Sequence, residues 1–283
     1  MHRTALTTLA LALLLAAPLR ADDAPTARQR AEAALTEAIA ARTARDYDAA
    51  LAACARALAL DPAWSTLYTE RGEIHYQRGM HRQAVADQTK AIELEPGLAI
   101  AHARRGRSLG KLNKMKQGEA DCTRAIELAP TDPRTWSMRG HVRRWLEDYP
   151  GAIKDLDRAL ELDQTDAVTF DHRGHVRRLM GDREGAIADA TRAIELDPKF
   201  PIAYLNRARA HHELGAFPAA AEDCDRAIAL DPLVWQAHAM RGEIYAKAGD
   251  KVAARRHLKA AREIAPPPIW ETLDRQIAEL GPE

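Results

Sequence analysis

The charged residues with the most regular spacing are arginines and aspartates that recur along the chain. An arginine returns at a constant interval of thirty-four positions, and an aspartate follows most of these arginines sixteen positions later. Because a guanidinium pairs with a planar carboxylate through two parallel hydrogen bonds, this spacing predicts ion pairs that brace two helices, within a repeat or between repeats. A role for these arginines in binding a ligand is the alternative. The arginines are Arg71, Arg105, Arg139, Arg173, Arg207 and Arg241, and the aspartates are Asp87, Asp121, Asp155, Asp189 and Asp223.

Two histidines, His172 and His175, have a spacing that could bind a metal ion. Residues three apart lie on one face of a helix, and imidazole is a common zinc ligand. No carboxylate completes a ligand set with this pair, and the positive charges of Arg178 and Arg209 would repel a cation. We therefore expect no metal site and no cofactor.

The sequence carries none of the common catalytic motifs. It has no glycine-rich loop suited to a phosphate, no His-Glu pair of the metalloprotease kind and no nucleophile elbow. The three cysteines, Cys54, Cys122 and Cys224, are separated by multiples of the same interval and never fall in adjacent repeats. We expect these cysteines to be too far apart for disulfides and to be small buried side chains. Since no catalytic motif is present, we expect a protein that is not an enzyme.

The net charge of the chain limits the choice of partners. Lysine and arginine total 41, aspartate and glutamate total 41, and the formal net charge is zero. Overall charge therefore favours neither nucleic acid nor an anionic membrane surface, and any attractive field must be local.

The segment 1–21 differs in composition from the rest of the chain. His2 and Arg3 precede the uncharged stretch 5–19, and Ala21 is followed by two aspartates. This order is typical of a cleaved secretory signal, and the apolar stretch is short for a membrane span. We expect cleavage near Ala21 and a periplasmic or secreted protein with no stable membrane span. An uncleaved anchor and an accidental apolar start are the alternatives.

The elements that must position these residues repeat at the interval of the arginines, with no insertion or deletion. In the unit from Ala167 to Phe200, one helix is expected up to Met180, Gly181 supplies a left-handed turn residue, and a second helix ends before Pro198. Positions 8, 20 and 27 of every unit are glycine or alanine, so two helices can approach closely there. Position 30 is leucine or isoleucine and is expected in the core. Position 32 is proline in six of seven units.

These small residues, an aromatic tendency at position 4 and the proline at position 32 resemble the tetratricopeptide repeat. The resemblance implies an all-α, right-handed superhelical solenoid of helix-turn-helix units that contact mainly their neighbours. The chain departs from the family at position 7, where arginine stands in place of the usual leucine. The expected organisation is a signal peptide at 1–21, a lead-in at 22–30, seven units at 31–64, 65–98, 99–132, 133–166, 167–200, 201–234 and 235–268, and a C-terminal capping helix and tail at 269–283.

Both ends of the repeat array have recognisable signals. Thr26 and Gln29 have the spacing of a capping box, which predicts a first helix that reaches Thr43. Three prolines at 266–268 interrupt the last unit, and an amphipathic pattern follows at 269–280. We expect this segment to cover the open side of the last unit. A helix that docks onto a partner is the alternative.

In tetratricopeptide proteins the first helix of each unit lines a concave groove. The corresponding stripe in units 3 to 6 is rich in arginine, lysine and histidine, whereas the end units are mixed. Converging cations on a concave wall focus positive potential even on a neutral protein. The alternative is a solvated polar face that binds nothing in particular. The predicted groove residues are Arg104, Arg107, Lys111, His141, Arg144, Trp145, His172, His175, Arg178, Arg209 and His212.

The resemblance implies a non-enzymatic protein–protein interaction module or adaptor, which we expect in the cell envelope as a monomer. The groove predicts an acidic or carboxylate-bearing extended segment of another protein as ligand, and nucleic acid is not expected. Protonation of the groove histidines below about pH 6.5 would strengthen the grip on such a ligand. A scaffold that assembles an envelope or secretion complex through its convex face or ends is the alternative. A cytoplasmic co-chaperone would require the signal prediction to be wrong.

Overall fold

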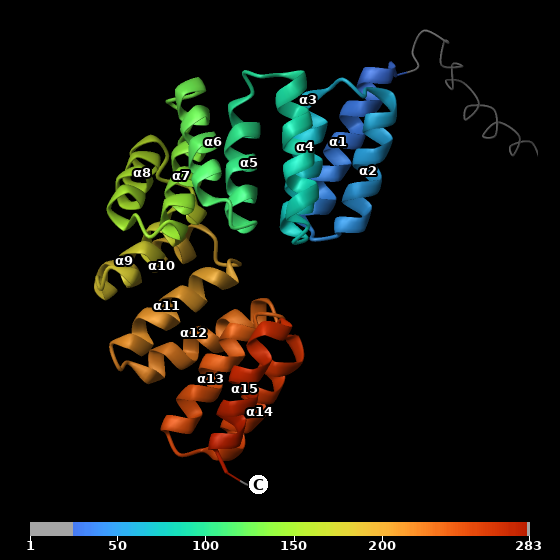
Figure 1. Cartoon of the computed structure of the whole chain (residues 1–283). Helices are drawn as coiled ribbons and strands as arrows, with labels where there is room; N and C mark the ends of the chain where they lie inside the picture. Colours follow the sequence, from blue (N-terminus) through green and yellow to red (C-terminus); the bar gives the residue numbers. More distant parts are fainter. Residues whose placement is uncertain (1–24, 282–283) are drawn as a thin grey trace, which may run out of the picture.

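The computed structural model describes residues 25–281, so the predicted signal peptide at 1–21 lies outside the described residues. Fifteen α-helices and no strands form the described part of the chain (Figure 1). Between residues 25 and 281, no helix has both the length and the apolar character that a membrane span needs. The helices are α1 (Ala27–Thr43), α2 (Tyr47–Leu60), α3 (Ser65–Gln77), α4 (His81–Leu94), α5 (Ala99–Lys111), α6 (Met115–Leu128), α7 (Pro133–Trp145), α8 (Tyr149–Leu162), α9 (Ala167–Leu179), α10 (Arg183–Leu196), α11 (Pro201–Glu213), α12 (Phe217–Leu230), α13 (Trp235–Lys247), α14 (Lys251–Ile264) and α15 (Pro267–Glu279).

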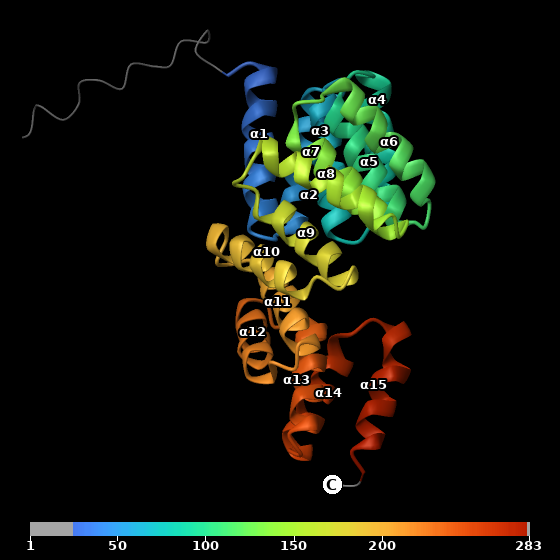
Figure 2. The same ribbon diagram turned by 90° about the vertical axis from the view of Figure 1, so that its left-hand side faces the viewer.

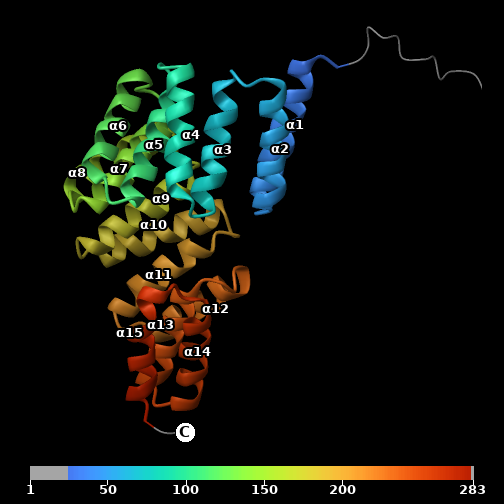
Figure 3. The same cartoon turned by 45° about the vertical axis from the view of Figure 1, so that its right-hand side comes forward.

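The helices pair within each unit, and the pairs stack into the predicted right-handed superhelix. Each second helix packs against the first helix of its own unit and of the next unit. First helices of successive units also touch, as α5 does with α7, α7 with α9, and α9 with α11. The pairs turn along the stack, so that α11 runs across the direction of α5 (Figure 1), and the other views show the same turning (Figures 2 and 3). The first helices therefore form one continuous inner face.

Small residues make the close helix contacts, as predicted. Where Gly106 of α5 meets Gly118 of α6, a Cβ added to Gly118 would lie 2.4 Å from the carbonyl oxygen of Gly106. The expectation that position 30 is a core position is wrong, because these side chains are only partly buried and Leu94 is 36% exposed. They lie in the last turn of each second helix, at the edge of the stack. The alanines at position 27 are buried in every unit, at Ala57, Ala91, Ala125, Ala159, Ala193, Ala227 and Ala261.

The turns between paired helices require a left-handed residue. Gly181 has φ of 89°, and glycine fills the same position in three other units, whereas Arg45, Asn113 and Glu147 take it with φ near 60°. The side chain of Asp182 accepts a hydrogen bond from the amide of Gly185 and so caps the second helix. The local sequence thus sets the angle at which the two helices of a unit meet.

The ends of the array match their predicted signals. The capping box of Thr26 and Gln29 is formed in front of α1. At the other end, α15 packs against α14 and buries Leu273 and Leu280 (Figure 2). The amide of Gln276 on α15 donates to the carboxylate of Glu243 on α13. The last helix therefore covers the final unit, as a capping helix should.

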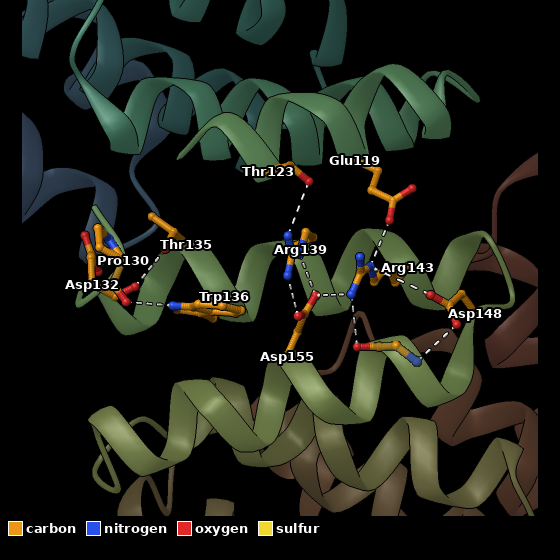
Figure 4. Close-up of polar contacts among 11 residues, drawn as sticks. Glu119, Thr123, Pro130, Asp132, Thr135, Trp136, Arg139, Arg143, Asp148 and Asp155 are labelled. Carbon is orange, nitrogen blue, oxygen red and sulfur yellow. Dashed lines mark hydrogen bonds and ion pairs between the residues drawn. The ribbon is translucent and has the colours of Figure 1, made fainter. Parts of the chain in front are cut away.

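The predicted ion pairs form, and they join three helices rather than two. In unit 4, Arg139 of α7 donates from Nε and Nη2 to Asp155 of α8, both at 2.8 Å (Figure 4). Its Nη1 donates to the hydroxyl of Thr123 on α6 of the preceding unit at 3.3 Å. In units 3 to 6 the guanidinium thus ties the two helices of its own unit to the second helix of the unit before. The same pairs to aspartate form at Arg71, Arg105, Arg173 and Arg207.

Two variations on this pattern are informative. Unit 7 carries His257 where units 2 to 6 carry aspartate, and Arg241 instead pairs with Asp225 of unit 6 at 2.7 Å. In units 4 and 5 a second guanidinium also reaches the aspartate: Arg143 lies 3.1 Å from Asp155 (Figure 4), and Arg177 lies 2.9 Å from Asp189. We call the arginines at position 7, together with their carboxylate partners, the interhelix ladder.

Unit 1 also contacts unit 6 through one ion pair. Arg45, in the turn between α1 and α2, donates to the carboxylate of Asp231, which follows α12, at 2.7 Å. The Arg45 side chain is 61% exposed, so the pair is worth about 0–1 kcal/mol. Units 1 and 6 are therefore joined by a weak, solvent-exposed contact.

Candidate functional site

The eleven predicted groove residues lie on four first helices that follow one another along the inner face. The contacts of α5, α7, α9 and α11 bring their side chains together. Arg104, Arg107 and Lys111 lie on α5, His141, Arg144 and Trp145 on α7, His172, His175 and Arg178 on α9, and Arg209 and His212 on α11.

The two basic residues nearest the N-terminal end of this surface are neutralised within the protein. Arg104 lies 3.7 Å from Glu70 and 3.3 Å from Glu73, both on α3. Arg107 forms an ion pair with the same Glu73, and its guanidinium lies 3.8 Å from the ring centre of Tyr76. Arg104 and Arg107 therefore have internal partners for their charge.

Arg178, nearer the C-terminal end of the surface, is neutralised in the same way. Arg178 of α9 forms an ion pair with Glu213 of α11, which Arg183 also contacts at 3.2 Å. His212 lies 3.2 Å from the Nζ of Lys247. Arg178 is therefore balanced by a carboxylate of the next unit.

Two cations between these ends have no carboxylate at ion-pair distance among residues 25–281. They are Lys111 and Arg144, which approach the Trp145 ring at 5.1 and 5.5 Å. Gly110 makes room for this ring, since an added Cβ would lie 2.4 Å from it. Burial lowers the pKa of Arg144, and for Lys111, whose side chain is exposed, partial desolvation and the neighbouring guanidinium of Arg144 lower the pKa. We call Lys111, Arg144 and Trp145 the central subsite.

Hydrogen bonds fix the tautomers of the two histidines beside this subsite. The Nη2 of Arg144 lies 3.2 Å from Nε2 of His141, and a guanidinium can only donate. His141 therefore carries its proton on Nδ1 and donates it to Nε2 of His172 at 2.8 Å. His172 then carries its proton on Nδ1, a buried atom with no partner among the described residues.

The predicted protonation of the groove histidines near pH 6.5 is wrong. Burial, with the positive charges around it, lowers the pKa of His172 and of His175 to about 3 and that of His141 well below its usual value. These three imidazoles therefore carry no charge at around pH 7. Within the described part of the chain, no three metal-binding side chains lie together.

A third cation lies two units further along, in a network that includes an unexpected buried acid. Arg209 of α11 donates to the side-chain oxygen of Asn206 at 3.0 Å, and Asn206 donates to Asp171 of α9 at 2.7 Å. Burial raises the pKa of Asp171 to about 6, against the effects of Asn206, Arg209 and Arg144. Arg209 has no carboxylate at ion-pair distance among the described residues, and burial lowers its pKa.

The residues that the prediction did not include are Asp171 and Asn206. Both lie on the stripe of first-helix positions, but a single acidic residue on a mostly basic stripe gave no sign of its burial. Asp171 is only 5% exposed, and it acts on its neighbours through the hydrogen bond from Asn206 and through its charge.

The thiols take no part in this surface. All three cysteines are buried and free, as predicted. Burial raises the pKa of Cys54 and of Cys224 to about 12 and also raises that of Cys122, so none is a reactive thiolate at neutral pH.

Family models of the tetratricopeptide repeat match most of the chain. One matches residues 35–99, 173–233 and 224–267, and a second matches residues 99–132. No relative was found among curated protein sequences. The segment 133–172 between the matched regions carries His141, Arg144, Trp145, Asp171 and His172.

Solved structures of repeat proteins share the fold at low sequence identity. A tetratricopeptide repeat protein from Parabacteroides merdae is 18% identical, with a TM-score of 0.62 and 89% and 98% of the two chains covered. Pseudomonas aeruginosa pilF is 18% identical, with a TM-score of 0.59 and 76% and 98% covered. A human IFIT1 dimer with m7Gppp-AAAA is 18% identical, with a TM-score of 0.73 and 83% and 59% covered.

Proposed function

Because the chain belongs to the tetratricopeptide repeat family, whose fold serves protein–protein interaction, we propose that it is an adaptor for an acidic partner. It holds an extended, acidic segment of another protein on the inner face formed by α5, α7, α9 and α11. The observation that carries this proposal is the set of three cations, Lys111, Arg144 and Arg209, that form no ion pair with a carboxylate among residues 25–281, although the charge of Asp171 acts on Arg144 and Arg209.

The contrast with the other arginines supports a ligand. The chain has as many acids as bases, and the arginines of the interhelix ladder, Arg104, Arg107 and Arg178 all contact carboxylates. Partly desolvated cations that repel one another raise the free energy of the folded state. An anionic ligand would relieve this repulsion and would gain hydrogen bonds to guanidinium groups.

The aromatic side chain of the central subsite favours a peptide over RNA as the anionic ligand. The Trp145 ring lies within 5.5 Å of both Lys111 and Arg144, so it can pack against the apolar part of a residue that the cations bind. Single-stranded RNA, which accompanies the human IFIT1 structure, offers anions too. The zero net charge of this chain favours the peptide.

The proposed setting is the cell envelope, where the protein works as a monomer that holds its partner. This setting depends on the sequence pattern of residues 1–21, whose apolar stretch and small final residue are those of an exported protein. Amino-terminal sequencing of the protein recovered from the envelope fraction should begin near Asp22. An intact amino terminus in the cytosol would contradict the setting.

The test is capture of a partner by two variants with the same change in net charge. Chain 22–283 is compared with the variant Lys111→Gln/Arg144→Gln/Arg209→Gln. The matched control, Lys116→Gln/Lys154→Gln/Arg226→Gln, changes three exposed cations of α6, α8 and α12. We expect an acidic peptide, followed by fluorescence anisotropy, and a partner from envelope extract to bind wild type and control but not the first variant. Equal binding by all three proteins would contradict the proposal.

A further inference from the structure

The inner face presents its unpaired cations at two separated places, with a different environment between them. The first place is the central subsite, where Lys111 and Arg144 flank Trp145. The second is Arg209 on α11, which is partly exposed and bonded only to the neutral amide of Asn206. We call Arg209 the distal subsite.

The helix between these places does not offer a free cation. On α9, the charge of Arg178 is taken by Glu213, and His172 and His175 are neutral near pH 7. The Asp171 carboxyl, which faces Arg144 of α7 and Arg209 of α11, carries a negative charge above about pH 6. An acidic ligand residue placed over α9 would therefore meet repulsion and no compensating partner.

The distance between the two subsites follows from how the helices pack. The helices α7 and α9 are in direct contact through His141 and His172, and α9 and α11 through Asp171 and Asn206. Packed helix axes lie about 8–10 Å apart, so two such steps separate the subsites by roughly 16–20 Å. An extended chain advances about 3.3 Å per residue, and about five or six residues span this distance.

We propose, on the basis of the proposed function, that the partner segment is bipartite. It carries one acidic residue for the central subsite and a second acidic residue about five or six positions away for the distal subsite. The residues between them are uncharged. The surface therefore selects the spacing of the acids in addition to their number.

The test uses synthetic peptides of one length and one composition, each with two glutamates on an uncharged Ser/Asn/Gly background. The glutamates stand two, five or nine positions apart, and a peptide with glutamate at every second position serves as reference. We expect the peptide with spacing five to bind at least tenfold more tightly than the peptide with spacing two. The variant Arg209→Gln should abolish this preference, while the exposed control Lys154→Gln should keep it.

Three results would overturn the inference. Equal affinity for the three spacings, with the reference peptide bound, would overturn the bipartite ligand and leave the proposed function intact. Failure of every peptide, the reference included, would overturn both. Tight binding of an oligoadenylate RNA in place of the peptides would also overturn both.

Discussion

The interhelix ladder and the inner face use the same chemical groups in opposite ways. In the ladder, each arginine of units 2 to 6 meets a carboxylate of its own unit, and the bonds join neighbouring helices. On the inner face, Lys111, Arg144 and Arg209 have no carboxylate at ion-pair distance, and the charge of Asp171 acts on Arg144 and Arg209 without forming a salt bridge to either. Internally paired charges of this fold therefore join helices to one another, whereas the three cations without an ion-pair partner are the ones that we propose bind the acidic segment.

The largest effect is expected from breaking the ladder in unit 4. The variant Asp155→Ala removes a carboxylate whose side chain is 1% exposed and leaves Arg139 and Arg143 without it. Unpairing a buried ion pair costs about 3–5 kcal/mol, and we expect a loss of this size in urea unfolding. As control, Glu161→Ala removes the exposed partner of Arg158 on the same helix and should change stability by about 0–1 kcal/mol. Similar losses for both variants would mean that the ladder is not what stabilises the stack.

A gain in stability is expected from neutralising the buried acid of the inner face. Above pH 6 the folded protein holds the charged Asp171 in a buried place, whereas the unfolded chain ionises near pH 3.9. The variant Asp171→Asn keeps an oxygen that can accept from Asn206 and removes this penalty. We expect it to be more stable by roughly 1–3 kcal/mol at pH 7.5, with the gain lost between about pH 6 and pH 4.

The contribution of Asp171 is measured as the difference between the urea unfolding free energies of the variant and of wild type at pH 7.5 and 4.5. A variant that is less stable than wild type at pH 7.5 would show that the Asp171 charge supports the fold by holding Arg144 and Arg209.

The histidines of the inner face should make the protein sensitive to acid. Folded His175 stays neutral down to about pH 3, while the unfolded chain takes up this proton near pH 6.5. The unfolded state therefore binds more protons, and stability falls by about 1.4 kcal/mol per pH unit for this one group as the pH drops below 6.5. We expect His175→Gln to reduce the slope of stability against pH by this amount. An unchanged slope in urea unfolding between pH 6.5 and 4.5 would show that folded His175 does take up the proton.

The smallest effect on stability is expected from replacing Arg144, a residue of the proposed binding site. The variant Arg144→Gln removes a cation that repels Lys111, and it also removes the hydrogen bond to His141. These terms oppose each other, so we expect a change within about 1 kcal/mol of zero in thermal unfolding. A loss comparable to that of Asp155→Ala would place Arg144 with the structural arginines and remove the distinction between the two regions.

The sequence contains enough information for the fold because the repeat has a strict period. Glycine or alanine recurs at three positions of every unit in the sequence, which predicted closely packed helix pairs, and the structure contains these pairs. The ladder was also predictable, since Arg139 and Asp155 recur with constant spacing. That the arginines of units 3 to 6 also reach the preceding unit was not predictable, because the contact depends on how stacking places residues such as Thr123 of α6.

The surface was predictable in position but not in charge. Sequence position places Arg107 and Arg144 on the same stripe, yet only one of them is neutralised, because Glu73 of the previous unit comes within reach of Arg107. Similarly, a solvated histidine and a buried one have the same letter in the sequence. The pKa of His172 is lowered because neighbouring helices bury this side chain. The spacing of residues in the sequence does not predict that burial.

The most direct test of the central claim measures the thermal stability of the protein as an acidic peptide is added. A ligand that binds only the folded state raises the melting temperature with its concentration. We expect wild type and the control Lys116→Gln/Lys154→Gln/Arg226→Gln to be stabilised by the reference peptide, and Lys111→Gln/Arg144→Gln/Arg209→Gln to melt at one temperature throughout. Equal stabilisation of all three proteins would contradict the claim that the unpaired cations of the inner face form the binding site.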